Sequence, residues 1–211
     1  MASSIVACSG VLGIEKAEHD EKLDQTGAGG KGAGGSDGTS GTSSTGGTAT
    51  GPKTLCERYC DTVMANCTGD NPVYKSRAVC DEVCKVLPPG RPGDTDVDSI
   101  ECRLHFAELV ATLGEASVNC PAAGPGGDGI CGANCEGFCT IALAACPDSP
   151  VSGVGCAKAC SDLPDPGGYT SNIDSGDSVE CRLYHASAAT VDPATHCRHT
   201  GGVGACFPPK P

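Results

Sequence analysis

The chain has 211 residues, of which 17 are cysteine and 3% are aromatic, and its formal net charge is −12. This acidity argues against a nucleic-acid partner, whose phosphates require basic patches, and against adsorption to anionic lipid headgroups. High cysteine content with little bulky apolar material is typical of a disulfide scaffold in an oxidising compartment. No run of 18 apolar residues is present, so no membrane-spanning helix is expected.

Residues 1–25 contain a motif that resembles a bacterial lipobox, Ile5-Val6-Ala7-Cys8. In a lipobox the cysteine receives the lipid and becomes the mature N-terminus, so Cys8 is the expected lipid anchor and the residues after it a juxtamembrane segment. A signal peptide also needs a basic region and a longer apolar region. Only seven residues precede Cys8, so we expect the true start of the chain to lie upstream.

Residues 26–53 consist almost entirely of Gly, Ser, Thr and Ala. Such a segment cannot bury enough surface to offset the entropy of ordering, so we expect a disordered tether. A glycine-rich phosphate loop would need a strand before it and a helix after it. Neither is visible in the sequence, so no phosphate site is predicted here.

The remaining cysteines form two copies of one pattern, in residues 54–131 and 132–211. Each copy begins C-x3-C-x6-C, continues with a second C-x3-C, and has Cys-Arg-Leu at its sixth cysteine. The first copy contains Cys56, Cys60, Cys67, Cys80, Cys84, Cys102, Cys120 and Cys131. The second copy contains Cys135, Cys139, Cys146, Cys156, Cys160, Cys181, Cys197 and Cys206.

Capping signals predict three helices in each copy. In the first copy the helices begin at Thr54, after Asn71 and near Asp98, and the last two end at Pro88 and Gly114. The corresponding starts in the second copy are Asn134, Ser149 and Asp177. The predicted fold is therefore all-α, small and disulfide-rich, with two tandem modules, each a helical hairpin plus a third helix. Only three residues separate Cys131 from Cys135, so the modules are expected to abut.

Helical spacing predicts half of the disulfides. Two antiparallel C-x3-C helices place four sulfurs on facing stripes, so the first cysteine meets the fourth and the second meets the third. This predicts Cys56–Cys84, Cys60–Cys80, Cys135–Cys160 and Cys139–Cys156. The other assignments, which spacing does not fix, are Cys67–Cys102, Cys120–Cys131, Cys146–Cys181 and Cys197–Cys206. The layout resembles the twin C-x3-C helical hairpins of small mitochondrial chaperones and plant hairpin peptides, a resemblance that implies geometry alone.

Metal binding is the main alternative use of the cysteines. Thiolates at i, i+4 on facing helices could bind zinc or copper, although zinc sites more often contain C-x2-C turns. The histidines do not recur between the copies and so give this reading no support. Redox or haem chemistry would require C-x-x-C, which is absent. Asp94, Asp96, Asp98 and Glu101 could suggest calcium, but helix capping explains the last two more simply. We therefore expect no metal and no cofactor.

The whole layout resembles a group of cysteine-rich lipoproteins predicted from myxobacterial genomes. The matching stretches are ACSGVLGIE at 7–15, the Gly/Ser/Thr tether, CERYCDTVM at 56–64, PGGDG at 125–129 and CRLYH at 181–185. The resemblance spans nearly the full chain. It implies location and build and carries no activity.

No catalytic constellation is visible, so the protein is not expected to be an enzyme. The predicted function is a cell-envelope lipoprotein that displays disulfide-stapled helical modules, in the outer membrane or at the cell surface, for binding or structural roles. Its partner would be a protein or a surface glycan, and the lipid anchor would be its contact with the membrane. The alternative is sequestration of zinc or copper by free thiolates.

Overall fold

The computed structural model describes residues 51–149, 151 and 155–207, and these lie in one compact unit. The proposed anchor Cys8, the segment 1–25 and the tether as far as residue 50 lie outside the described residues. Within the described part the fold is all-α with no strand, which confirms the predicted fold class. The elements are α1 Leu55–Asn66, α2 Arg77–Val86, α3 Ile100–Leu113, α4 Ala116–Ala123, α5 Asn134–Ala145, α6 Cys156–Ser161, α7 Val179–Ala189, α8 Pro193–Thr200 and the 3-10 helix η1 Gly204–Cys206.

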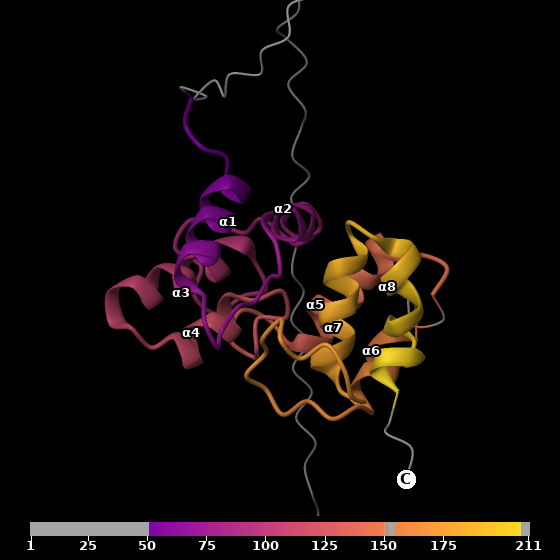
Figure 1. Ribbon diagram of the computed structural model, residues 1–211. Helices are drawn as coiled ribbons and strands as arrows, with labels where there is room; N and C mark the ends of the chain where they lie inside the picture. The colour runs from indigo at the N-terminus through magenta and orange to yellow at the C-terminus, as the bar shows by residue number, and fades with distance from the viewer. Residues whose placement is uncertain (1–50, 150, 152–154, 208–211) are drawn as a thin grey trace, which may run out of the picture. The chain divides into compact units, whose positions relative to one another are not determined.

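Each copy contains a fourth helix that the sequence did not predict. These helices are α4 and α8, and they carry Cys120 and Cys197. α4 packs against α3, and α8 packs against α7, so each covers the third helix of its own copy. Figure 1 shows α1, α3 and α4 grouped together and α5 to α8 grouped together, with α2 between the two groups.

The helix starts follow capping chemistry closely. Thr54 forms the predicted capping box with Glu57, and Ser99 and Ser178 cap α3 and α7 through their side chains. The predicted start of the second helix after Asn71 is wrong, because α2 begins at Arg77 with Ser76 as its cap.

The segment before α2 is instead used to join the copies. Val73 and Tyr74 are buried there, and the Pro72 carbonyl accepts a hydrogen bond from Ser171 N at 2.6 Å. A helix that began at Pro72 would remove this extended stretch from its contacts with the second copy.

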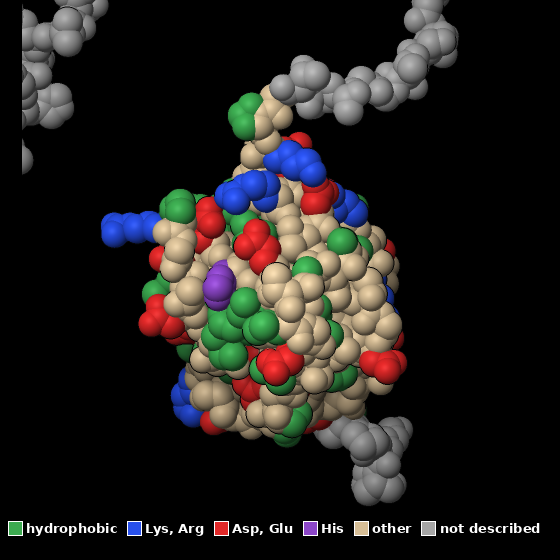
Figure 2. Space-filling view, turned by 90° about the vertical axis from the view of Figure 1, so that its left-hand side faces the viewer, with side chains coloured by type: hydrophobic (Ala, Val, Ile, Leu, Met, Phe, Trp, Pro, Cys, Tyr) green, Lys and Arg blue, Asp and Glu red, His purple; other side chains and the backbone are tan. Residues whose placement is uncertain are grey.

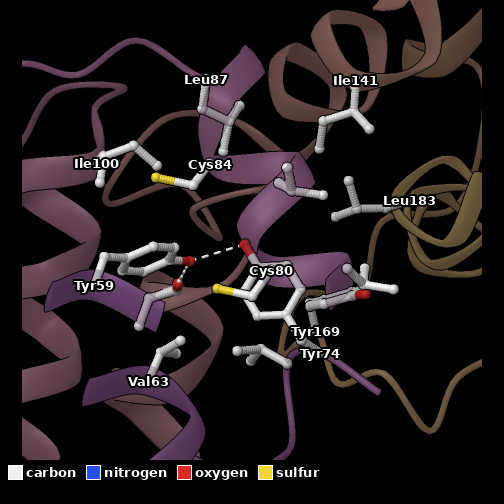
Figure 3. Packing of buried hydrophobic residues seen from close by; sticks show 14 of the residues in the cluster. Tyr59, Val63, Tyr74, Cys80, Cys84, Leu87, Ile100, Ile141, Tyr169 and Leu183 are labelled. Carbon is white, nitrogen blue, oxygen red and sulfur yellow. Dashed lines mark hydrogen bonds between the residues drawn. The ribbon is translucent and has the colours of Figure 1, made fainter. Parts of the chain in front are cut away.

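One hydrophobic core runs through both copies. Tyr59 and Val63 of the first copy belong to the same buried cluster as Ile141 and Leu183 of the second (Figure 3). α2 packs against both α5 and α7 and so links the two halves of this core. No helix in the described part is long and apolar enough to cross a membrane.

All sixteen described cysteines form disulfides. Four are the predicted hairpin bridges Cys56–Cys84, Cys60–Cys80, Cys135–Cys160 and Cys139–Cys156. This density of disulfides is typical of an oxidising, extracellular environment.

The other four predicted pairings are wrong. In place of Cys67–Cys102, Cys120–Cys131, Cys146–Cys181 and Cys197–Cys206, the bridges are Cys67–Cys120, Cys102–Cys131, Cys146–Cys197 and Cys181–Cys206. The order of pairing is the same in both copies.

The direction of α3 relative to α1 explains the correction. Arg58 contacts Glu101, and Asn66 donates to the Ala107 carbonyl, so the two helices run in the same direction. Cys67 at the end of α1 therefore lies beside the middle of α3, away from Cys102 in its first turn. The unpredicted helix α4 brings Cys120 to Cys67.

Candidate functional site

The second copy holds two features that could bind a ligand, and both involve α8. Asp192 caps this helix and Pro193 occupies its first turn, which fixes where it begins. The Cys146–Cys197 disulfide ties its middle to the end of α5. One face of α8 lines an open cleft, and the neighbouring face carries two histidines.

The cleft has a volume of about 550 Å³ and lies between α8 and the end of α5. Pro193, Cys197 and Gly201 form its α8 wall, one helical turn apart. The lining is mainly apolar and contains no aromatic side chain. Its charged members are Asp148 and Arg198, and Arg198 is exposed and makes no ion pair with any described residue. A volume of this size is typical of small-ligand sites.

Three histidines meet on the other face of α8. His185 of α7 is only 5% exposed, and His196 and His199 of α8 are partly buried. The Nδ1 atoms of His185 and His196 are 2.8 Å apart, and the ring centroids of His185 and His199 are 4.4 Å apart. Tyr184 stacks edge-on against both His185 and His196.

Hydrogen bonding fixes the tautomers of the closest pair. His185 Nε2 lies 3.1 Å from the Asp174 carbonyl oxygen, which can only accept, so this nitrogen carries the hydrogen. Burial lowers the pKa of His185 to about 4 and lowers that of His196 below its usual range. Both rings are therefore neutral near pH 7. The Nδ1 lone pair of His185 then accepts the hydrogen that His196 Nδ1 donates.

Residues 34–134 match the BfoA family C-terminal domain. The match covers the first cysteine copy and ends at the first residue of α5, so the cleft and the histidine cluster lie outside it. This supports a family-level relationship for the first copy. No curated protein and no solved structure matches the chain.

The histidine cluster is not predicted from the sequence. Its histidines do not recur in the first copy, where Phe106, Asn119 and Ala122 occupy the corresponding places. The available signal was the i, i+3 spacing of His196 and His199, which puts both on one helical face. Without a prediction of α8 this spacing carried no weight.

The thiolates and carboxylates considered as alternative metal ligands make other contacts. Donor atoms of Cys181, His185 and Cys206 lie within 4.8 Å of one another, but the two sulfurs form one disulfide and offer no thiolate. Among the acidic residues considered for calcium, Asp94 accepts from Ser99 Oγ, and Asp98 pairs with Arg103 at 2.8 Å. These carboxylates brace the start of α3, whose N-cap is Ser99.

Proposed function

We propose that the protein is a non-enzymatic binding module of the cell envelope, anchored by a lipid on Cys8, whose cleft between α5 and α8 receives a partner. The observation that carries the proposal is an open, mainly apolar cleft on a helical head in which every described cysteine is bridged. Covalent closure suits a head exposed to proteases and variable conditions outside the cell.

The lining of the cleft favours a protein partner over a glycan. Sugar binding would use aromatic faces and many hydrogen-bonding groups, whereas this lining has no aromatic ring and is mostly apolar. An apolar side chain fits such a surface. The Arg198 guanidinium, which pairs with no acidic group in the described part of the chain, suits an acidic group beside that side chain. The expected occupant is therefore an apolar residue of a partner protein next to a carboxylate.

The location is tested with the protein expressed from its own gene in its own cells. The full chain is expected in the membrane fraction, with labelled fatty acid attached, and Cys8→Ala is expected in the soluble fraction without label. Recovery of unlabelled wild-type protein from the cytosol with free thiols would overturn the envelope assignment.

The cleft is tested by placing a photo-crosslinking amino acid at Val203, which lines it and is 55% exposed. The matched control is Val118 on α4, which is 56% exposed and lies away from the cleft. Figure 2 shows the side of the molecule that carries α3 and α4 in Figure 1, and apolar side chains also gather there. A discrete protein adduct is expected from Val203, absent from Val118 and reduced by Arg198→Glu. Equal adducts at both positions, or none at Val203, would exclude the cleft as the docking site.

A further inference from the structure

We propose that His185 and His196 form a binding site for a divalent transition-metal ion of the copper(II) or nickel(II) type, with His199 as a third imidazole beside it. This site is separate from the cleft. It also uses no cysteine, and so differs from thiolate sequestration. The inference rests on the geometry of the two Nδ1 atoms, on the groups that orient them and on the comparison between the two copies.

The two Nδ1 atoms face each other and share one hydrogen. His185 Nδ1 presents its lone pair, and His196 Nδ1 donates toward it at 2.8 Å. A metal ion can replace this hydrogen bond once His196 changes tautomer. Its Nδ1 proton leaves to solvent and its Nε2 takes up a proton, so that the ion bonds to the Nδ1 lone pairs of two neutral imidazoles. Imidazole nitrogen is a preferred ligand of copper, nickel and zinc.

The spacing indicates which ions fit best. Two neighbouring nitrogens about 2.0 Å from an ion in square-planar geometry are about 2.8 Å apart, because they subtend a right angle. A tetrahedral ion at the same bond length holds them about 3.3 Å apart. In distance, the 2.8 Å separation of His185 Nδ1 and His196 Nδ1 therefore matches copper(II) or nickel(II) better than zinc, and both rings turn so that their lone pairs converge on the ion.

The surroundings orient the His185 ring as in established metal sites. A ligating histidine usually donates its second ring N–H to a carbonyl or carboxylate, and His185 Nε2 donates to the Asp174 carbonyl. The edge of Tyr184 holds the rings in place. The carboxylates of Asp174 and Asp192 act electrostatically on His185 and His196 and favour a cation.

His199 can supply a third nitrogen ligand. Its Nδ1 lies 2.7 Å from the Val203 carbonyl oxygen, which can only accept, so the shorter of its contacts places the hydrogen on Nδ1 and the lone pair on Nε2; Ala205 N lies 3.0 Å from the same Nδ1. Its Nε2 makes no hydrogen bond with any described residue and so keeps its coordination capacity. The His199 ring is the one that must turn to complete the set.

The fold does not require these imidazoles. The first copy has the same order of disulfide pairing and the same helix plan with Phe106, Asn119 and Ala122 in place of His185, His196 and His199. A histidine in a tight cluster costs desolvation that the phenylalanine counterpart avoids. The cluster is thus particular to the second copy, and metal binding gives it a use.

The test is a titration of the purified, oxidised full chain with copper(II), followed by calorimetry and electron paramagnetic resonance. One equivalent is expected to bind with hyperfine splitting from at least two nitrogens. Replacement of each histidine by its first-copy counterpart gives the variants His185→Phe, His196→Asn and His199→Ala. His196→Asn is expected to weaken binding at least tenfold, and His199→Ala to weaken it less. His105→Ala, in the first copy, is the control and should leave this site unchanged.

Two measurements keep the result interpretable. Circular dichroism identifies any variant that fails to fold, and because His196 is only partly buried, His196→Asn decides the matter even if His185→Phe unfolds. Alkylation of any free thiol beforehand should leave binding unaffected. Binding that survives in the His185→Phe/His196→Asn double variant, that disappears on alkylation, or that shows no nitrogen splitting would overturn the proposal.

Discussion

The Arg58 guanidinium of α1 donates to the Glu101 carboxylate of α3 at 3.1 Å, and the second copy lacks this ion pair. The corresponding residues there are Gly137 and Glu180. Glu180 is 1% exposed and its Oε1 accepts from Gly167 N at 3.2 Å, whereas its buried Oε2 has no hydrogen-bond partner among the described residues. The second copy therefore buries a carboxyl group that the first copy neutralises.

Glu180→Gln should stabilise the protein at high pH. Burial raises the pKa of the Glu180 carboxyl, and Asp165 raises it further. The folded state therefore keeps the Glu180 proton to a higher pH than the unfolded chain does. The contribution of Glu180 to the free energy of unfolding is thus greatest in acid and falls as the pH rises through the raised pKa. Glutamine removes this loss, and we expect a gain of about 1 kcal/mol at pH 8 that shrinks toward pH 4. Urea unfolding of both proteins across this pH range, with disulfides intact, measures the difference in their free energies of unfolding.

The control for Glu180 is Glu101→Gln, which removes an ion pair whose arginine is largely exposed. Such pairs contribute about 1 kcal/mol or less, so this variant should lose a little stability at neutral pH. A Glu180→Gln protein less stable than the wild type at pH 8 would contradict the account of a buried, unneutralised carboxyl.

Tyr59→Phe should destabilise the protein by about 1–2 kcal/mol. The buried Tyr59 hydroxyl donates to the Ala123 carbonyl at 2.7 Å and accepts from the Tyr74 hydroxyl at 2.8 Å (Figure 3). The variant leaves both partners buried and unpaired. The ring itself would still fit, since Phe138 fills the matching place in the second copy. Thermal or urea unfolding gives the loss.

Thr112→Ala is the matched control for Tyr59→Phe, because it also removes a hydroxyl bonded to a carbonyl, but at an exposed site. It should change the free energy of unfolding by less than about 0.5 kcal/mol. Equal effects of the two variants would mean that burial of the tyrosine pair does not set the cost.

Local chemistry made part of this architecture predictable. The hairpin bridges follow from the i, i+4 spacing of Cys56 and Cys60, which puts both sulfurs on one stripe whatever the rest of the chain does. The cap at Thr54 likewise depends only on residues within one turn. All-α character and disulfide density follow from the same short-range features.

The remaining features depend on packing that no short segment encodes. α4 has no side-chain cap and contains Pro121, so it carries no start signal and an apparent stop. Without α4 the partner of Cys67 could not be found, and without α8 the meeting of His185 with His196 could not be foreseen. α2 begins later than the sequence predicts because Val73 and Tyr74 are more stable when buried against the second copy than they would be in an extra turn of helix.

Gly137→Ala should disrupt the contact between the copies. A Cβ at this position would lie 2.4 Å from the Pro125 carbonyl oxygen, a backbone atom that cannot move aside alone. We expect a loss of about 2 kcal/mol or more, as for other overpacked sites. Gly155→Ala is the control, because a Cβ there meets nothing within 4 Å. Unfolding free energies that do not differ between the two variants would show that α5 can shift away from Pro125.

Peptide mapping tests the corrected disulfide pairing. Trypsin cleaves after Arg58 and Arg103. Cleavage before Asp61 then separates Cys60 from Cys67, and cleavage before Asp128 separates Cys120 from Cys131. Under non-reducing conditions the peptide with Cys67 should be linked to the peptide with Cys120. A link from Cys67 to the peptide ending at Arg103 would contradict the corrected pairing and support Cys67–Cys102.

Loop length should decide which of two buried disulfides contributes more to the free energy of unfolding. Cys67–Cys120 spans a sequence separation of 53 and Cys60–Cys80 one of 20, and all four cysteines are buried. The loss of chain entropy in the unfolded state grows with the logarithm of loop length, which gives about 4 kcal/mol for the longer loop and about 3 kcal/mol for the shorter. The double variant Cys67→Ala/Cys120→Ala should therefore lose about 1 kcal/mol more than Cys60→Ala/Cys80→Ala in urea unfolding. A larger loss of unfolding free energy in Cys60→Ala/Cys80→Ala would contradict this account. It would mean that the hairpin bridge stabilises the protein mainly through native packing and only secondarily by restricting the unfolded chain.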